Sequence, residues 1–237
     1  MAIVRSLQDY SQQFLSLKWA FSNTKSRKEF ALNKSAVKDL SANALEVALD
    51  NGLENGILKD IPVFGIAIKI AELTMSIRDH FFLQKLSKFI FKLESVSDKE
   101  KSAINDFSRS SDSEKISNKI IQVIDNVTDI EKAELISKLF ISYCSGKINK
   151  SNFLRSVDTI HSYFIDDITE FVSASNLWFY TYEDLEHQNL ENLVGSPLIK
   201  EQFMDRQDLI RSGRESEIGI TNYENSNFGE IFRKALK

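Results

Sequence analysis

The chain has 237 residues and a formal net charge of −4, with 42% hydrophobic and 27% charged residues, which is ordinary for a soluble globular protein. Its 8 Gly and 2 Pro residues are too few for a turn-rich β architecture. The negative charge disfavours non-specific nucleic-acid binding by the whole surface. Because Met1–Arg5 lacks a signal-peptide pattern and Cys144 has no cysteine to pair with, we expect a cytoplasmic protein.

Two helices are predicted before residue 57. Ser35–Asp50 is the second of them, and Gly52 breaks it. The first is predicted from large apolar residues that recur every three or four positions, namely Leu7, Tyr10, Phe14, Leu17 and Phe21.

The most apolar part of the chain is residues 57–93, in which a helical stripe begins after Pro62. Proline suits the first turn of a helix, where its missing N–H would have no partner. We expect this stretch to contain a candidate interaction or membrane-directed element. Its residues are Ile61, Pro62, Val63, Phe64, Gly65, Ile66, Ile70, Leu73 and Ile77.

A second apolar stripe follows at Phe82, but it is out of phase with the first, because the step from Ile77 to Phe82 is five residues. This phase shift predicts either a bend or a meeting of two helices. We therefore take Arg78, Asp79 and His80 as a candidate hinge.

The apolar element is too short for a constitutive membrane span, which needs about 20 mostly apolar residues. Its longest uncharged run is Ile61–Ile68, and Lys69 and Glu72 follow it. A helix buried in the core is the favoured interpretation. Release of the helix to a partner or a membrane remains open, because the first 92 residues carry 13 basic and 9 acidic side chains, a charge that suits an anionic membrane face.

Three capping-box spacings predict three further helices, which begin near Ser97, Ser111 and Thr128, each with a Glu three positions later. Gly146 then ends a helix, and the next helix is predicted from Lys150 to Phe171 with Phe164 on its apolar stripe. The connection between them carries no carboxylate, so this hairpin is not a calcium-binding EF-hand.

The composition changes after Ser173. An aromatic segment, Leu177–Tyr182, precedes a predicted helix at Tyr182–Val194 and a further segment at Leu198–Arg211. A strand at Ile218–Tyr223 and a last helix at Asn227–Leu236 complete the prediction.

The tail of the chain resembles the last strand and helix of a winged-helix domain. In that resemblance Tyr223 lies on the strand, Ser226 caps the helix, Gly229 occupies its first turn and Phe232 is the aromatic residue three positions later. DNA binding is disfavoured even so, because the predicted recognition helix, Tyr182–Val194, carries four acidic residues and no Lys or Arg.

From about Leu53 to its end, the chain also resembles a loosely defined group of bacterial accessory and prophage-associated proteins. The matching motifs are Ile61-Pro62-Val63-Phe64-Gly65 and Ile77-Arg78-Asp79-His80-Phe81-Phe82-Leu83-Gln84-Lys85-Leu86. The resemblance implies a role in phage defence and brings no catalytic residues.

No constellation for catalysis, metal binding or cofactor binding is found. The three histidines, His80, His161 and His187, have no partner at zinc-ligand spacing. Phosphate-binding and nucleophile-elbow motifs are not found either. Cys144 fits a buried small hydrophobe better than a nucleophile.

These observations predict a mainly α protein, with a multi-helix bundle at residues 1–173 and a small α+β winged-helix-like domain at residues 174–237. We expect a non-enzymatic bacterial effector or accessory protein that acts through protein partners or as a homo-oligomer, with conditional contact to the inner membrane. A winged-helix transcriptional regulator or nucleic-acid accessory protein is the alternative. No cofactor and no small-molecule substrate is predicted.

Overall fold

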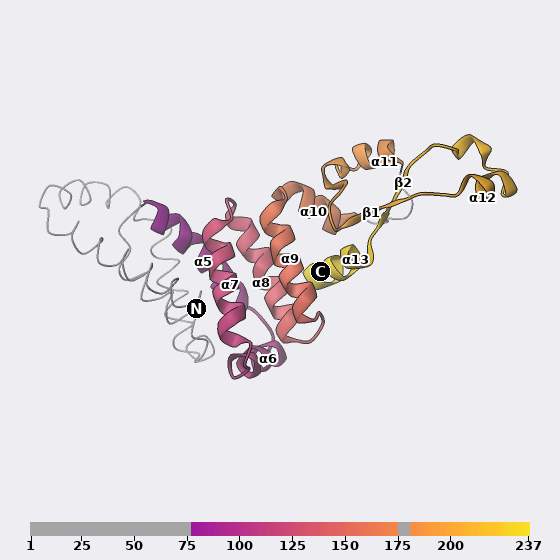
Figure 1. Cartoon of the computed structure of the whole chain (residues 1–237). Coiled ribbons are helices and arrows are strands. Elements are labelled where there is room, and N and C mark those ends of the chain that lie inside the picture. Colours follow the sequence, from indigo (N-terminus) through magenta and orange to yellow (C-terminus); the bar gives the residue numbers. More distant parts are fainter. Residues whose placement is uncertain (1–76, 175–180) are drawn as a thin grey trace, which may run out of the picture.

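The computed structural model describes residues 77–174 and 181–237. The two predicted N-terminal helices, the apolar element up to residue 76 and residues 177–180 of the aromatic segment lie outside the described residues. Within these ranges the chain is mainly helical, with a two-stranded antiparallel sheet near the C-terminus (Figure 1). This confirms the predicted mainly α class.

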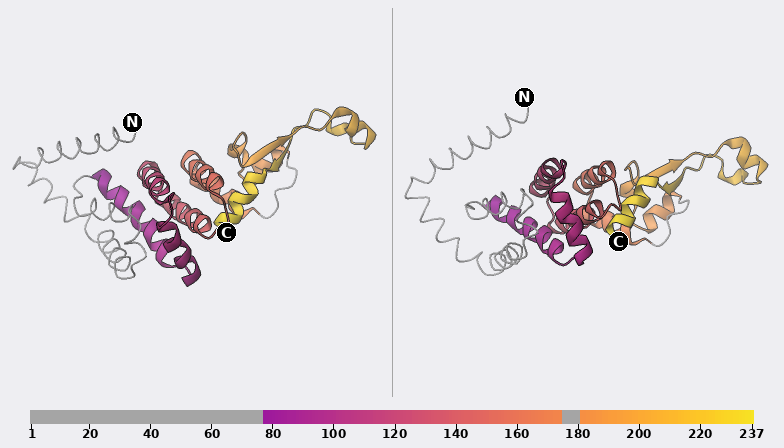
Figure 2. Two further views of the ribbon diagram at one scale, coloured as in Figure 1. Left: turned by 60° about the horizontal axis from the view of Figure 1, so that its bottom comes forward. Right: turned by 90° about the horizontal axis from the view of Figure 1, so that it is seen from below.

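The body of the molecule is a helical bundle with α8 (Ile130–Cys144) in its centre (Figures 1 and 2). Among the described residues, helix α8 makes its main contacts with five other helices. These are α5 (Ile77–Glu94), α6 (Asp98–Ser108), α7 (Ser113–Asn126), α9 (Lys150–Ser162) and the C-terminal helix α13 (Asn227–Leu236). A further helix, α10 (Ile165–Ser173), packs against α13.

Aromatic rings fill the centre of the bundle, and Phe140 of α8 is the hub. Its ring lies 6.0 Å from that of Phe89, 5.1 Å from Phe107 and 6.4 Å from Phe153. All four rings are buried, so each removes a large apolar area from water. The buried apolar residues of α5, α7 and α8 belong to one common core.

One of the three predicted capping boxes is confirmed. The Ser97 hydroxyl accepts the amide of Glu100, whose carboxylate accepts the amide of Ser97. The predicted boxes at Ser111 and Thr128 are wrong, because the caps of α7 and α8 are the aspartates that follow those residues and neither side chain caps its helix. Asp112 forms an ion pair with Lys150 instead.

The hairpin between α8 and α9 forms as predicted. Gly146 has a φ of 71°, a conformation that glycine adopts without a steric penalty. The amide of Gly146 donates to the carbonyl of Tyr143 at 3.0 Å, and the amide of Lys147 donates to that of Ser142 at 2.9 Å. This bond pair is a Schellman motif, so the helix end is set by local sequence.

The predicted continuous helix from Lys150 to Phe171 is wrong. Helix α9 ends at Ser162, and the backbone is extended at Tyr163 and Phe164 before α10 begins. Phe164, expected on the apolar stripe, is 59% exposed. The break lets α10 bury Phe171 with its ring 6.4 Å from that of Phe232 on α13, so a contact across the fold overrides the helical periodicity.

The chain from residue 181 onward consists of short elements. They are α11 (Tyr182–His187), the 3-10 turn η1 (Glu191–Leu193), β1 (Ile199–Gln202), α12 (Arg206–Arg211), the 3-10 turn η2 (Glu215–Glu217), β2 (Asn222–Asn225) and α13. The bounds predicted for α13 are confirmed.

Two other predictions for this part need correction. The helix expected at Tyr182–Val194 ends at His187, and Asn189 has a φ of 54°, which lets the chain turn and bury Leu190. The segment Leu198–Arg211 holds a strand and a short helix, and the second strand lies at Asn222–Asn225 instead of Ile218–Tyr223. The pairing of β1 with β2, which local sequence does not specify, sets these strand bounds.

One hydrophobic core extends across residue 174. The buried hydroxyl of Ser142 on α8 donates at 2.7 Å to the carbonyl of Ala235 on α13, so the C-terminal helix is tied into the bundle. The division into domains at residues 173 and 174 stays a prediction. None of the helices in residues 77–174 and 181–237 is both long and apolar enough to cross a membrane.

Candidate interaction surface

Residues 199–225 form an arm that projects from the helical body (Figures 1 and 2). Its base is the pair β1 and β2, and we call residues 203–221, which lie between the strands, the tip. The strands are antiparallel, with Ile199 opposite Asn225 and Gln202 opposite Asn222. The tip includes α12 and η2, which pack against each other.

The base of the arm is anchored at Ser226, the N-cap of α13. Its amide donates to the carbonyl of Leu198 at 2.9 Å, and its hydroxyl donates to that of Pro197 at 2.6 Å. The same hydroxyl accepts the amide of Gly229 at 2.9 Å. One side chain thus caps α13 and holds the start of β1 against it.

Glycine is required at position 229 because α13 lies close to the backbone at Leu198. A Cβ atom at this position would meet the carbonyl oxygen of Leu198 and the side chain of Asn225 well inside van der Waals contact. The missing side chain lets α13 lie directly on the strand base. Tyr223 of β2 is buried and Phe232 of α13 is fully buried, so the base of the arm is continuous with the core.

The tip has its own small structure. Leu209 of α12 is buried, and its carbonyl accepts the amide of Arg214 at 2.8 Å. The carboxylate of Asp205 caps α12 by accepting the amide of Gln207 at 2.7 Å. Gly213, with a φ of 72°, turns the chain back toward η2. These local bonds give the tip a defined shape away from the core.

Charged side chains of the tip pair with one another. Arg214 donates to Glu217 at 2.7 Å through Nε, and Arg211 lies 3.6 Å from the carboxylate of Asp208. The hydrogen bond and the charge of Arg214 lower the pKa of Glu217, and Glu217 raises the pKa of Arg214 in turn. The tip carries three basic and four acidic residues, so its net charge is close to zero.

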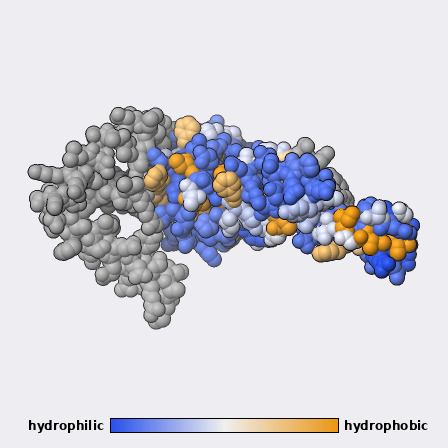
Figure 3. All heavy atoms as spheres, turned by 90° about the horizontal axis from the view of Figure 1, so that it is seen from above, coloured by the Kyte–Doolittle hydropathy of each residue, from blue (hydrophilic) through white to orange (hydrophobic). Residues whose placement is uncertain are grey.

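Large apolar side chains lie exposed on the tip (Figure 3). Phe203 is 78% exposed, and Ile210, Ile218 and Ile220 are 45%, 39% and 45% exposed. Single exposed apolar residues are normal, but a group of them on one small projecting element marks an interaction surface. The tip therefore offers an apolar contact surface with little net charge.

The sequence carries no periodic signal for this surface. The four residues are separated by 7, 8 and 2 positions, which fits neither a helix nor a strand. The four residues of the winged-helix resemblance lie at the base of the arm or on the helix that follows it, with Tyr223 on β2 and Ser226, Gly229 and Phe232 on α13. The exposed tip was missed.

The candidate hinge of the apolar stretch lies in the first turn of α5. The backbone of Arg78, Asp79 and His80 is helical and continuous with the rest of α5. The residues of the interaction or membrane-directed element before Ile77 lie outside the described residues. Their role in a membrane or partner contact stays a prediction.

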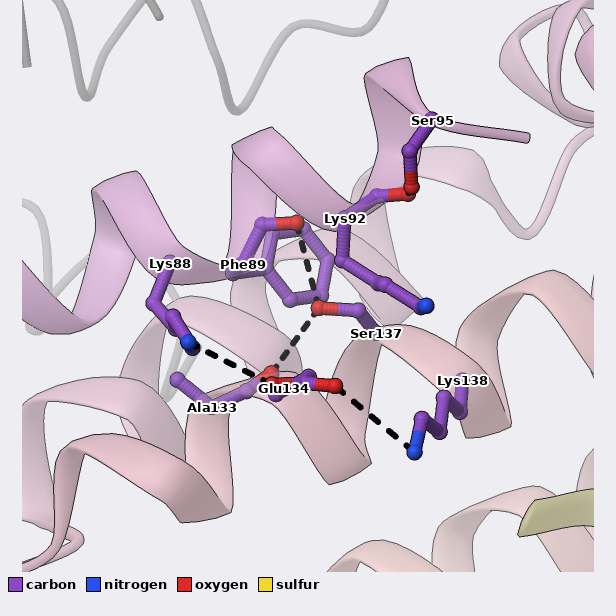
Figure 4. A network of polar contacts seen from close by, with 8 residues as sticks. All are labelled: Lys88, Phe89, Lys92, Ser95, Ala133, Glu134, Ser137 and Lys138. Atoms are coloured by element: carbon purple, nitrogen blue, oxygen red, sulfur yellow. Dashed lines mark hydrogen bonds and ion pairs between the residues drawn. The ribbon is translucent and has the colours of Figure 1, made fainter. Parts of the chain in front are cut away.

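Helix α5 and helix α8 are joined by a polar network at the edge of the core (Figure 4). The buried hydroxyl of Ser137 lies 3.1 Å from the carbonyl of Phe89 and 2.9 Å from that of Ala133. On the surface, Glu134 lies between Lys88 at 3.4 Å and Lys138 at 3.7 Å. This network stabilises the contact of the two helices and leaves no unpaired cluster that resembles a reactive site.

Reactive chemistry is not indicated in the part of the chain that the structure describes. Burial raises the pKa of the Cys144 thiol well above its ordinary value, which makes this thiol a weak nucleophile at neutral pH. His161 and His187 are exposed. Across the described ranges no group of three or more His, Cys, Asp or Glu residues is arranged to hold a metal ion.

Comparison with known proteins returned no match, whether against protein-family models, curated proteins or solved structures.

Proposed function

We propose that this protein is a non-enzymatic interaction protein and that the tip of the arm is its contact surface for a protein partner. The observation that carries the proposal is the exposure of Phe203, Ile210, Ile218 and Ile220 on an element that projects from the body. Four large apolar side chains in water on one element cost free energy that docking to a partner recovers.

The charge of the tip supports a protein partner over a nucleic acid. Proteins that bind DNA place unpaired Lys and Arg side chains against phosphates. In the tip, Arg211 and Arg214 form ion pairs with acidic neighbours, and acidic residues outnumber basic ones. Phosphates would have to break these pairs, whereas an apolar pocket would not.

We further propose a bacterial effector or accessory role, with phage defence as the setting. This setting rests on the resemblance described above. A conditional role of residues 61–77 at the inner membrane belongs to the same proposal. Liposome flotation of the full chain, with and without phage infection of the cells that produce it, tests the membrane part, and absence of binding in both states would eliminate it.

The proposed contact surface can be tested by photocrosslinking in living cells. Phe203 is replaced by the photoreactive analogue p-benzoyl-phenylalanine in the full-length chain, and the matched control carries the same analogue at Phe164, which is 59% exposed on the body. We expect covalent protein adducts from position 203 that position 164 does not give. Equal adducts at both positions, or none at 203, would overturn the proposal.

A winged-helix regulator is the second candidate, and the two-stranded antiparallel sheet with its long connection followed by α13 favours it. Against it, the element in the place of a recognition helix is α11, with six residues and three acidic side chains. DNA binding that weakens with salt and is lost in Arg206→Glu would support this candidate. Absence of any mobility shift at low salt would eliminate it.

A further inference from the structure

We infer that the partner of the arm tip is the tip of a second copy of this chain, so that two molecules form a dimer through their tips. The inference rests on the proposed function and specifies the partner. It is drawn from the charge balance of the tip, the acidic surface of α10, α11 and η1, and the apolar area that the tip exposes.

The charge balance of the tip suits a contact with its own copy. In a two-fold symmetric dimer the same patch lies on both sides of the interface, so an unbalanced charge on the patch repels itself. The tip has three basic and four acidic residues, and four of the seven form the pairs Arg211–Asp208 and Arg214–Glu217. Two tips can therefore approach each other with little repulsion.

The part of the body that includes α10, α11 and η1 could not serve the same purpose. Residues 163–199 contain seven acidic residues and no Lys or Arg, and the acidic residues lie in α10, α11 and η1. The side chain of Asn192 in η1 donates at 3.3 Å to Asp167 in α10, so these acidic elements are neighbours. The acidic residues are Asp166, Asp167, Glu170, Glu183, Asp184, Glu186 and Glu191.

This acidic surface decides how two copies can meet. Like charges repel over a distance of about 8 Å at physiological salt, so two molecules that met through these acidic surfaces would repel each other. A contact through the tips keeps the two acidic surfaces apart, because the arm extends the tip away from α10 and α11 (Figure 1). The projecting arm thus acts as a spacer in the dimer.

The exposed area suggests a weak dimer. The four apolar side chains of the tip offer roughly 300–400 Å² in each copy, whereas a standard interface buries about 800 Å² in each partner. The polar atoms of α12 and η2 would supply the rest. We therefore expect a dissociation constant in the micromolar range, with Phe203 as the central anchor because aromatic residues dominate such contacts.

Sedimentation velocity of the full-length chain between about 1 and 100 µM tests this inference. We expect reversible dimer formation that does not weaken between about 0.05 and 0.5 M NaCl, since the contact is apolar. The double variant Phe203→Asp, Ile220→Asp should raise the dissociation constant at least about tenfold. The control Phe164→Asp should dimerise like the wild type, and matching thermal unfolding curves show that all three proteins are folded.

Two separate serine-to-cysteine variants give a second measurement that does not depend on loss of binding. Ser216 is exposed in the tip and Ser151 is exposed in α9 of the body. Under mild oxidation Ser216→Cys should form a disulfide-linked dimer, and Ser151→Cys should stay monomeric. A wild-type monomer up to about 100 µM, or a dimer that the tip variants leave unchanged, would overturn the inference.

Failure of the inference can be told apart from failure of the proposed function. A photocrosslink from position 203 to a different protein, with a monomeric wild type, would keep the arm as a contact surface and reject the dimer. No adduct from position 203 to any protein would reject both. An adduct with twice the mass of the chain supports both.

Discussion

The helical body and the arm use the same residue type in opposite ways. In the body, Phe153 is fully buried and lies against Phe140 and Tyr143, whereas Phe203 of the arm is 78% exposed. Burial of a phenylalanine stabilises the fold of its own chain. An exposed phenylalanine contributes little to that fold and remains available to another molecule, so the comparison separates stability from interaction.

The polar contacts of the two regions differ in the same way. The bond from Ser142 to Ala235 in the body is buried, so its loss would leave a carbonyl without water or a partner. The ion pairs of the tip are exposed to solvent and contribute little to stability. The tip can therefore change its sequence at small cost to the fold, which suits a contact surface.

The largest effect is expected from truncation of the body core. Phe153→Ala should reduce the free energy of unfolding by about 3–5 kcal/mol, because it removes buried ring contacts and leaves a cavity. Phe203→Ala, the matched change in the arm, should alter it by less than about 0.5 kcal/mol. Urea denaturation of both variants measures the difference, and equal losses would mean that the arm is part of the stabilising core.

The junction of the two regions should come second. Gly229→Ala places a methyl group against the backbone of Leu198, and we expect a loss of about 2–3 kcal/mol from overpacking. The control Glu230→Ala, one position further along α13, should cost about 0.5 kcal/mol, since it removes an exposed pair with Lys234. A loss at Gly229 no larger than at Glu230 would contradict the close packing of α13 on the strand base.

A smaller effect is expected from the buried bond between α8 and α13. Ser142→Ala should cost about 1–2 kcal/mol, because the carbonyl of Ala235 loses its donor. Ser87→Ala is the control, since its hydroxyl donates to the carbonyl of Leu83 within one helix and should cost less. Hydrogen exchange of the last turn of α13 should quicken only in the Ser142 variant.

The smallest effect concerns Glu94 at the end of α5, whose pKa is raised because burial outweighs the attraction of Lys101. A carboxyl whose pKa is higher in the folded than in the unfolded chain lowers stability as the pH rises through that interval. Glu94→Gln should therefore stabilise the protein slightly at pH 7, and this gain should vanish below the ordinary pKa of a glutamate. Thermal unfolding between pH 3 and pH 7 measures it, and a constant gain would contradict the shift.

Helices with strong local signals were predicted correctly. The Ser97 capping box, the glycine at position 146 and the bounds of α13 all match the structure. Each of these depends on residues within one helical turn of one another, so the sequence carries the information directly.

The errors lie where distant contacts compete with local patterns. The apolar stripe predicted a helix that continues through Phe164. In the structure the helix is broken at Tyr163 and Phe164, and Phe171 of α10 packs on Phe232 of α13. The cap expected at Ser111 does not form. The next residue, Asp112, occupies the N-cap position of α7 and forms an ion pair with Lys150 of α9. Residues 61–76, singled out for their apolarity, lie outside the described residues, so their role stays a prediction.

By itself the sequence determined a mainly helical protein and the position of most helices after Glu94, because helical periodicity and caps are local properties. Only the tertiary structure decided that α13 closes the bundle and that the chain between β1 and β2 projects as an arm. The apolar residues of the tip are spaced without period, and their exposure depends on where the rest of the fold leaves them.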